Sequence, residues 1–247
     1  MILRATWRSI PRGNRYYSPV SDLRPFRVNE IFLSVQGEGV HVGERTVFVR
    51  MYGCPLRCVW CDQPEALSTS GVGRFQMMSP EAVRDRVAGF PAVRRLCLTG
   101  GEPLIAPADS LGWLLDQLRA AGWWVSVETS GARFVDSLLE RIDFWTISPK
   151  GESAATFDGD PVEAQLPTLR RLVELPLERR QLKFVIQSEG DVRDAVRMLD
   201  ALDYRGAVVL QPEHGSGDGR AVFEWWPWER YPDARVIPQT HKAVGLH

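Results

Sequence analysis

Three of the four cysteines lie in one short stretch, and their spacing suggests a metal centre. Cys54, Cys58 and Cys61 form a C-x3-C-x2-C pattern. Thiolates so close in sequence can bind one centre from a single loop, but three ligands do not complete the tetrahedral site of a structural zinc. An iron–sulfur cube held by three thiolates would leave one iron open to a small molecule. The fourth cysteine, Cys97, falls in an expected strand, where it suits a packed small apolar residue.

Length and composition limit the classes of protein. The 247 residues can bury one sizeable core, so one barrel-like α/β domain needs no second domain. Thirty Lys and Arg against 31 Asp and Glu give a net charge of −1, which attracts neither nucleic acid nor an anionic membrane. No apolar run approaches the ~20 residues of a membrane span. Cysteines gathered in one loop suit a reducing cytoplasm better than an extracellular disulfide framework, so we expect a cytoplasmic protein.

The elements that would position the cysteines alternate between strand and helix. Residues 1–26 lack such periodicity, and we expect a poorly ordered or extended arm there, followed by a single domain over residues 27–247. We expect loop at 64–76, strands at 28–35, 46–51, 95–98, 123–128, 144–148, 182–187, 207–211 and 234–237, and helices at 79–89, 111–121, 135–141, 162–175 (broken at Pro167) and 191–202. After a hairpin-like start, six strands can form a parallel set with right-handed crossovers.

Polar residues gather where these strands end. In barrel-like folds the carboxyl ends of the strands line one mouth. The residues expected to share that face with the cysteine loop are Arg50, Thr99, Glu102, Glu128, Thr129, Ser130, Ser148, Lys150 and Gln211. Within the string at 99–103, two glycines allow a ligand close to the backbone, and Glu102 can accept hydrogen bonds from a charged amine. Alone, this string could be an ordinary tight turn.

Two smaller features keep alternative interpretations. Lysine occurs only at Lys150, Lys183 and Lys242, which indicates either sites that need a compact point charge or three ordinary surface lysines. Three tryptophans within residues 225–228 indicate a lid, an interface or a stacking surface, or equally a short helix that plugs the bottom of the barrel.

The motifs together resemble a known superfamily. The cysteine loop, with Trp60 before its last cysteine, and the Thr-Gly-Gly-Glu-Pro string at 99–103 resemble the cluster loop and the methionine-binding motif of radical S-adenosylmethionine (SAM) enzymes. A narrower resemblance, to the 7-carboxy-7-deazaguanine synthase family, covers nearly the whole chain from Val28. It adds the segments at 33–39, 48–50, 148–150 and 239–242.

The narrower resemblance implies a fold, an activity and cofactors. The fold is α/β, an incomplete (βα)6-type radical SAM barrel modified with short helical elements. The activity is that of a radical SAM lyase of 7-deazapurine (queuosine) biosynthesis, which converts 6-carboxy-5,6,7,8-tetrahydropterin to 7-carboxy-7-deazaguanine with loss of ammonia. The cofactors are a 4Fe-4S cluster, SAM and Mg2+, and the partners are a second copy of the chain and an electron donor such as flavodoxin or ferredoxin.

The resemblance also implies roles for single residues. Cys54, Cys58 and Cys61 would bind the cluster. The pterin would contact Leu33, Gln36, Glu38, Arg50, Thr99, His241 and His247, the last through its α-carboxylate. SAM would contact Gly100, Gly101, Glu102, Ser130, Ser148, Pro149, Lys150 and Gln211. Gln63 stands where the family usually has a small hydroxyl residue that helps hold Mg2+, and an amide oxygen can also ligate this ion.

Two other classes of protein compete with this interpretation. Another radical SAM enzyme, such as a glycyl-radical-enzyme activase, would share the cysteine loop and the Gly-Gly-Glu-Pro string. We would not expect it to combine the Gln-Gly-Glu-Gly turn at 36–39 with the Thr-His-Lys at 240–242. A non-catalytic iron–sulfur or zinc protein would need a fourth ligand, such as Cys97 turned toward the loop.

Overall fold

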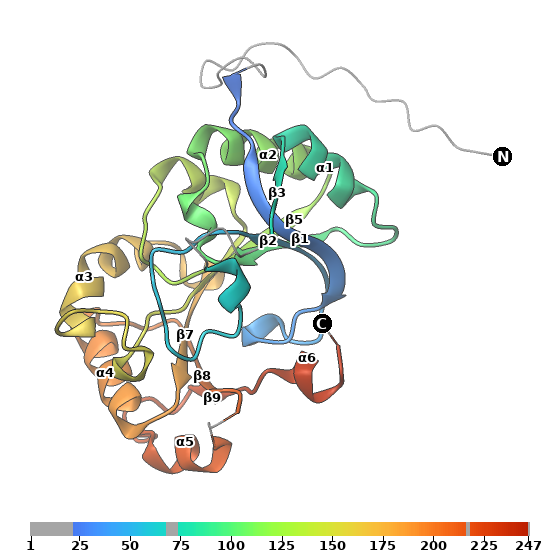
Figure 1. Cartoon of the computed structure of the whole chain (residues 1–247). Helices are drawn as coiled ribbons and strands as arrows, with labels where there is room; N and C mark the ends of the chain where they lie inside the picture. Colours follow the sequence, from blue (N-terminus) through green and yellow to red (C-terminus); the bar gives the residue numbers. More distant parts are fainter. Residues whose placement is uncertain (1–21, 68–73, 216–217, 247) are drawn as a thin grey trace.

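The computed structural model describes residues 22–67, 74–215 and 218–246. Within these ranges nine strands form one sheet in the order β3-β1-β2-β4-β5-β6-β7-β8-β9. β1 (Phe26–Val35) pairs antiparallel with β2 (Arg45–Met51) and with β3 (Gln76–Met78), and from β2 onward the pairing is parallel. The other strands are β4 (Arg95–Gly100), β5 (Trp124–Thr129), β6 (Phe144–Ile147), β7 (Arg180–Ile186), β8 (Ala207–Pro212) and β9 (Arg235–Val236). The sheet curves into a barrel (Figure 1). The barrel is open and incomplete, because β3 and β9 lie at opposite ends of the strand order.

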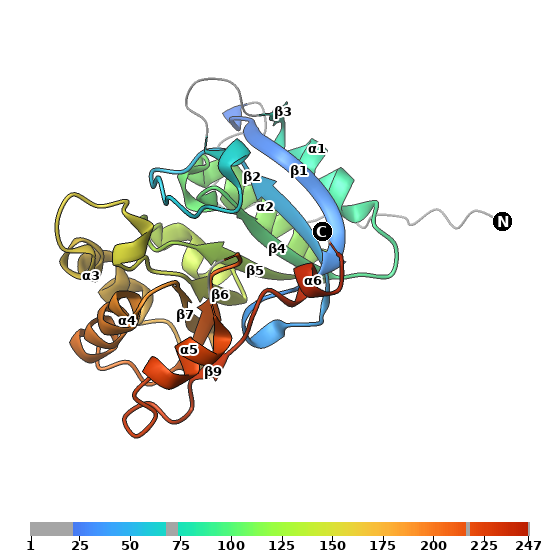
Figure 2. The same cartoon turned by 60° about the horizontal axis from the view of Figure 1, so that its bottom comes forward.

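Helices cover the outer side of the curved sheet (Figure 2). They are α1 (Pro80–Ala88), α2 (Ala108–Ala120), α3 (Pro161–Leu172) and α4 (Glu189–Ala201), with the shorter α5 (Gly219–Trp225) next to β8. A further short helix, α6 (Thr240–Ala243), lies apart from these, near the end of β1. Local sequence explains where two of them begin. Ser79 caps α1 by accepting from the Ala82 backbone N–H at 3.2 Å, and Ser188 and Asp191 form a reciprocal capping box at the start of α4.

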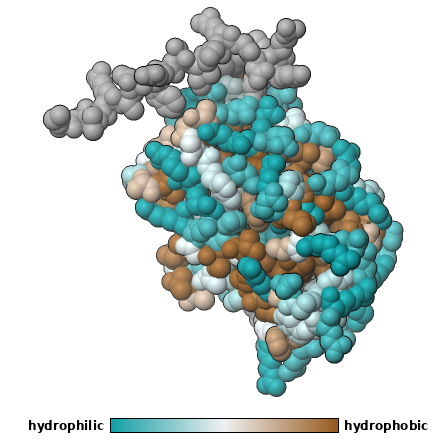
Figure 3. Space-filling model, turned by 180° about the vertical axis from the view of Figure 1, so that it is seen from behind, coloured by the Kyte–Doolittle hydropathy of each residue, from teal (hydrophilic) through white to brown (hydrophobic). Residues whose placement is uncertain are grey.

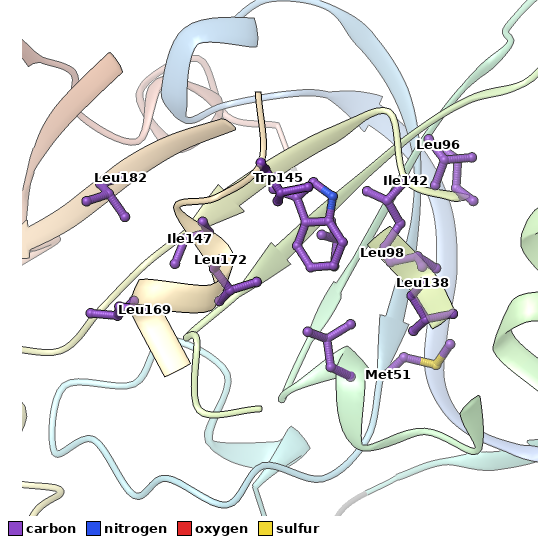
Figure 4. Packing of buried hydrophobic residues seen from close by; sticks show 14 of the residues in the cluster. Met51, Leu96, Leu98, Leu138, Ile142, Trp145, Ile147, Leu169, Leu172 and Leu182 are labelled. Atoms are coloured by element: carbon purple, nitrogen blue, oxygen red, sulfur yellow. The ribbon is translucent and has the colours of Figure 1, made fainter. Parts of the chain in front are cut away.

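The hydrophobic core fills the space between the sheet and these helices. Trp145 of β6 is fully buried and lies in the middle of the cluster in Figure 4. Strand β4 shows how the core is separated from the barrel interior. Leu96 and Leu98 belong to the core, whereas Cys97 and Thr99 contact polar groups inside the barrel. This alternation follows from the two-residue period of a strand.

The loop between β1 and β2 reaches into the barrel. The backbone N–H of Val40 donates to Gln181 Oε1 of β7 at 3.0 Å. His41 packs edge-on against Trp124 and Phe144, with ring centroids 4.9 and 4.5 Å apart. These contacts hold the loop that follows the turn at 36–39 against β5, β6 and β7.

Several sequence expectations need correction. Phe26, at the end of the expected arm, is fully buried in β1, and residues 1–21 of that arm lie outside the described part. Pro167 lies inside α3 without breaking it, because the buried leucines of that helix hold it against the core. Residues 135–141 were expected as an α-helix, but Asp136–Arg141 form a 3-10 helix. Residues 76–78 form β3 at the end of the expected loop at 64–76, because they pair with the start of β1. Residues 219–225 form α5, a short helix, which was one of the alternatives for the tryptophan-rich stretch; the helix begins earlier than that stretch and ends at Trp225.

Both polar and apolar residues reach the surface. On the face seen in Figure 3, hydrophilic residues surround a group of hydrophobic residues across the middle. Large apolar side chains that are exposed include Val59, Met77, Phe223 and Val244, which lie on separate segments. No helix in the ranges that the structure describes has the length and apolar character of a membrane span.

Candidate active site

A large cavity opens where the parallel strands end. Its wall combines the carboxyl ends of the strands with the turn at 36–39, the cysteine loop and the segment at 239–241. The cavity holds about 1310 Å³ of space free of protein atoms, open solvent included.

Cys54, Cys58 and Cys61 all face this cavity. The segment at 152–154 holds their loop in place, because the Val59 N–H donates to the Ala154 carbonyl at 3.0 Å. Burial raises the pKa of all three thiols, that of Cys54 to about 11. Free thiolates are therefore disfavoured here, and a bound metal would be needed to hold the sulfurs deprotonated. This set of three sulfur donors fits an iron–sulfur cluster with three protein ligands.

Cys97 stands apart from these three. It is fully buried in β4, and Gln36 Nε2 lies 4.0 Å from its sulfur. Burial and the nearby Glu128 charge raise the pKa of the thiol well above its ordinary value. Cys97 therefore takes the place of a small buried residue, not of the fourth ligand that a zinc site requires.

Two glycines at the end of β4, Gly100 and Gly101, bring this strand end against the start of the cysteine loop. Gly100 has a φ of +112°, and a Cβ there would lie 2.3 Å from the Met51 carbonyl oxygen. A Cβ on Gly101 would lie 2.0 Å from the Gly53 carbonyl oxygen. Any side chain at these positions would push the two segments apart, so both glycines are required for the shape of the cavity.

Glu102 organises the wall beside the glycines and is itself fully buried. Its carboxylate accepts from Thr129 Oγ1 at 2.8 Å, from the Ser130 N–H at 2.9 Å and from Ser130 Oγ at 2.6 Å. The carboxylate of Glu102 is directed at these donors, and Glu102 is not among the residues that line the cavity. Two other expected site residues also lie behind the wall: Pro149 is buried, and Leu33 packs against the hydrophobic core.

Lys150 brings a positive charge next to the cysteines. Its Nζ donates to Ser148 Oγ at 3.0 Å and lies 5.6 Å from the centroid of the Trp60 ring. The Trp60 indole is held by a 3.0 Å hydrogen bond to Ser153 Oγ. Burial lowers the pKa of Lys150, while the nearby Cys58 acts in the opposite direction.

Two carboxylates with different environments lie deeper in the cavity. Glu128 accepts from Gln36 Nε2 at 2.9 Å and from Thr99 Oγ1 at 2.8 Å. Burial and the charge of Glu38 raise the pKa of Glu128, so its protonated form is more favourable than usual.

Glu38 is the second carboxylate, and it forms an ion pair with Lys183. Lys183 Nζ also donates to Gln211 Oε1 at 3.3 Å. Burial acts to raise the pKa of Glu38, but the Lys183 charge and a hydrogen bond from Gln239 outweigh it and hold the pKa below its ordinary value. Burial acts to lower the pKa of Lys183, but Glu38 and Glu128 outweigh it and raise the pKa. Glu38 is therefore an ionised acceptor at the cavity wall.

Arg50 places a third cation in the cavity, at the end of β2. Its Nη1 donates to Glu30 Oε1 at 2.7 Å and to Gln63 Oε1 at 2.6 Å. The guanidinium carbon lies 5.1 Å from the centroid of the Phe32 ring. This arrangement can bind an anionic group of a ligand.

The segment near the end of the chain closes one side of the cavity. The His241 ring lies so close to Gly37 that a Cβ there would be 1.8 Å from His241 Nδ1. Burial lowers the pKa of His241, with Glu38 acting against it, so the neutral imidazole is favoured near pH 7. His247 lies outside the described residues.

Several polar residues of the cavity had no role assigned from the sequence, among them Asp62, Glu128, Lys183 and Gln239. The position of Glu128 at a strand end and the rarity of lysine had drawn attention to two of them. Gln239 belongs to a quoted motif without an assigned role. Nothing in the sequence distinguishes Asp62 from other surface carboxylates.

Comparisons with known proteins agree with these motifs. A family model described as Radical SAM superfamily matches residues 48–154. The 7-carboxy-7-deazaguanine synthase of Pyrobaculum aerophilum is 36% identical over 223 residues, which cover 87% of this chain and 92% of the relative. The enzyme of the same name from Methanospirillum hungatei is 30% identical over 238 residues, with 96% and 93% covered. The crystal structure of QueE from Escherichia coli matches with a TM-score of 0.68 at 25% identity, covering 87% of this chain and 94% of that one.

Proposed function

The chain belongs to the 7-carboxy-7-deazaguanine synthase family of radical SAM enzymes, and from this we propose that it converts 6-carboxy-5,6,7,8-tetrahydropterin to 7-carboxy-7-deazaguanine with loss of ammonia. The superfamily implies a 4Fe-4S cluster and SAM. The observation that carries the proposal is that the cysteine loop, the two glycines of the Gly-Gly-Glu-Pro turn and the turn at 36–39 face one cavity together with His241. The product would serve 7-deazapurine biosynthesis.

The cysteine loop supplies the first part of the reaction. We assign Cys54, Cys58 and Cys61 to the cluster, which when bound supplies the electron that starts radical chemistry on SAM. Lys150 lies beside the sulfurs and would balance part of the negative charge of the bound cluster.

SAM would lie between the cysteine loop and the ends of β4 to β8. Gly100 and Gly101 allow its close approach to the backbone, and Ser130, Ser148, Lys150 and Gln211 present polar groups to it. Glu102 would act by holding Ser130 and Thr129 in place, and Pro149 by shaping the backbone beside Lys150.

The pterin would occupy the deeper, polar part of the cavity. Ionised Glu38 can accept from adjacent N–H groups of an aminopyrimidine ring, and Arg50 can bind the carboxylate of the substrate. Gln36 and Thr99 hold Glu128, whose raised pKa favours a proton on its carboxyl group.

Magnesium is the remaining cofactor that the resemblance implies, and the donor set here does not fit it as arranged. The oxygen expected to hold the ion, Gln63 Oε1, already accepts from Arg50 Nη1 at 2.6 Å. A guanidinium so close disfavours a divalent cation at the same oxygen. If Mg2+ takes part, it requires Arg50 to move away from Gln63 or other oxygen ligands to bind it. We assign no step to the ion.

We also propose a homodimer and an external electron donor such as flavodoxin or ferredoxin, in the cytoplasm. The resemblance supports these partners. The cysteine loop reaches the surface, where Val59 is 71% exposed, so a donor protein can approach the cluster side of the cavity.

The test is anaerobic reconstitution with iron and sulfide, followed by metal analysis and incubation with SAM, reductant and the tetrahydropterin. Appearance of 7-carboxy-7-deazaguanine by mass spectrometry, dependent on each of the three loop cysteines, would support the proposal. Cleavage of SAM without consumption of the pterin would instead indicate another radical SAM reaction. A protein that holds iron but never cleaves SAM would indicate a non-catalytic iron–sulfur protein.

A further inference from the structure

Asp62 lies in the cysteine loop, yet its carboxylate contacts the segment at 239–242. We propose that Asp62 is a positioning residue that ties this segment over the substrate pocket and so sets the affinity for the pterin. The inference rests on the proposed function, because it concerns the same pocket.

Asp62 makes two contacts with that segment. Its Oδ2 accepts from Gln239 Nε2 and from Lys242 Nζ, both at 3.1 Å. The same Gln239 amide also donates to Glu38 Oε1. One amide therefore joins a carboxylate of the cysteine loop to a carboxylate of the substrate pocket. Gln239 is only 8% exposed, so water competes little for these hydrogen bonds.

The other side of the segment is held by the turn after β1. The Thr240 N–H and Oγ1 donate to the Gly37 carbonyl at 2.9 and 3.1 Å, and His241 packs on Gly37. Helix α6 accordingly lies beside the end of β1 in Figures 1 and 2. Thr240 and the bond from Gln239 to Glu38 both attach the segment to the turn after β1. Asp62 adds an attachment to the cysteine loop, and attachments to two separate loops fix the direction in which His241 faces.

The arrangement explains why a residue of the cysteine loop should affect the substrate. Asp62 follows Cys61 directly, so the position of its carboxylate depends on how the loop is folded. A loop ordered by its cluster would present Asp62 to Gln239 and Lys242, and the closed segment would complete the pocket. Pterin affinity and loop order are then coupled, and each must strengthen the other.

The experiment compares Asp62→Ala, Lys242→Met and a charge-swapped pair, Asp62→Lys with Lys242→Asp, in the cluster-loaded full chain. The readouts are the pterin Kd, the SAM Kd, the iron content and the rate at which carboxypeptidase trims the C-terminal segment. Asp62→Ala should weaken pterin binding by about tenfold, which corresponds to about 1.4 kcal/mol. Lys242→Met keeps the Gln239 hydrogen bond and removes only a partly exposed ion pair, so it should weaken pterin binding by about two- to threefold. Each single variant should also speed trimming, while SAM binding and iron content stay at the parent level. The swapped pair should recover part of the pterin affinity, because it restores one ion pair.

The matched control is Glu224→Ala, which removes an exposed ion pair with Arg220 on α5, away from the cavity. It should bind pterin and resist trimming like the parent. The inference is overturned if Lys242→Met and Asp62→Ala also behave like the parent in both readouts. If Asp62→Ala loses iron, Lys242→Met decides, because its change lies outside the cysteine loop. If the parent itself does not bind the pterin, the proposed function fails, and the trimming rates still decide whether Asp62 holds the segment.

Discussion

Replacement of Lys183 by methionine should destabilise the protein near neutral pH, because it removes the cation that two buried carboxylates share. The side chains of Lys183 and Glu38 are only 8% and 12% exposed. The same charge acts on Glu128, which lies close to Glu38 in the cavity. The substitution preserves most of the side-chain volume, so the loss of charge should dominate the effect.

The magnitude follows from the burial of the pair. Removing one partner of a buried ion pair typically costs about 3–5 kcal/mol, whereas an exposed pair contributes about 0–1 kcal/mol. In a chain of this size each kcal/mol shifts the unfolding midpoint by roughly 2–4 °C, so we expect a decrease on the order of 10 °C.

The loss should depend on pH in a defined direction. In the parent, Lys183 holds the pKa of Glu38 below its ordinary value of 4.5. The stability that Glu38 contributes is therefore present above that value and lost as the pH falls through the lower, folded-state pKa. In the variant, burial raises the pKa of Glu38, as it already does for Glu128, so stability is lost as the pH rises through the raised values. The difference in the free energy of unfolding between parent and variant should be largest near neutral pH. It should become smaller as the pH falls toward ~4.

The assay is thermal unfolding of the cluster-loaded protein under anaerobic conditions, at about pH 7 and about pH 5. A double variant, Lys183→Met with Glu38→Gln, is the matched control, because it removes the charge that the single variant strands. The double variant should recover part of the stability that Lys183→Met loses at neutral pH, because Glu38→Gln removes the buried charge that has lost its cation. A single variant that unfolds at the same temperature as the parent near pH 7 would show that the pair does not form, and the reasoning would fail.

Three further substitutions test other parts of the site. Cys97→Ala should leave the iron content unchanged, because Cys97 lies apart from the cysteine loop; loss of iron on quantitative metal analysis would contradict the three-ligand assignment. Gln63→Thr introduces the hydroxyl that the family usually has, and calorimetry should then show pterin binding that depends more on Mg2+ than in the parent; an equal dependence would refute this. Gly101→Ala should weaken SAM binding severely, because its Cβ would lie 2.0 Å from the Gly53 carbonyl oxygen. In the control Gly219→Ala, the nearest atom would lie 3.6 Å from the new Cβ, and SAM binding should equal that of the parent.

The alternation of strand and helix predicted most of the sheet, because each long strand carries a local pattern. The mostly apolar run at 182–187, for example, predicted a strand, and the corresponding β7 is buried along its whole length. β3 could not be predicted in this way, since three residues are too few for a period and the strand exists through its pairing with β1. The prediction of a helix break at Pro167 was wrong for the opposite reason. Local propensity disfavours a helix at that residue, but packing of α3 against the core outweighs the propensity.

The motifs predicted which segments meet at the cavity, because parallel strands bring their carboxyl ends to one edge. They did not predict which side chains pair inside it. The ion pair between Glu38 and Lys183 joins residues 145 positions apart and depends on how far the loop at 36–44 enters the barrel. The bond between Gln63 and Arg50 likewise depends on tertiary placement. Such pairings follow from the assembled fold, and spacing along the chain does not encode them.

The contact between Gly37 and Thr240 also determines when the pocket can exist during synthesis. These residues are 203 positions apart, and at ~5–20 residues per second a ribosome needs roughly 10–40 s to make the chain between them. The three cysteines leave the ribosome early in this interval. The loop proposed to receive iron is therefore available well before the proposed substrate pocket closes.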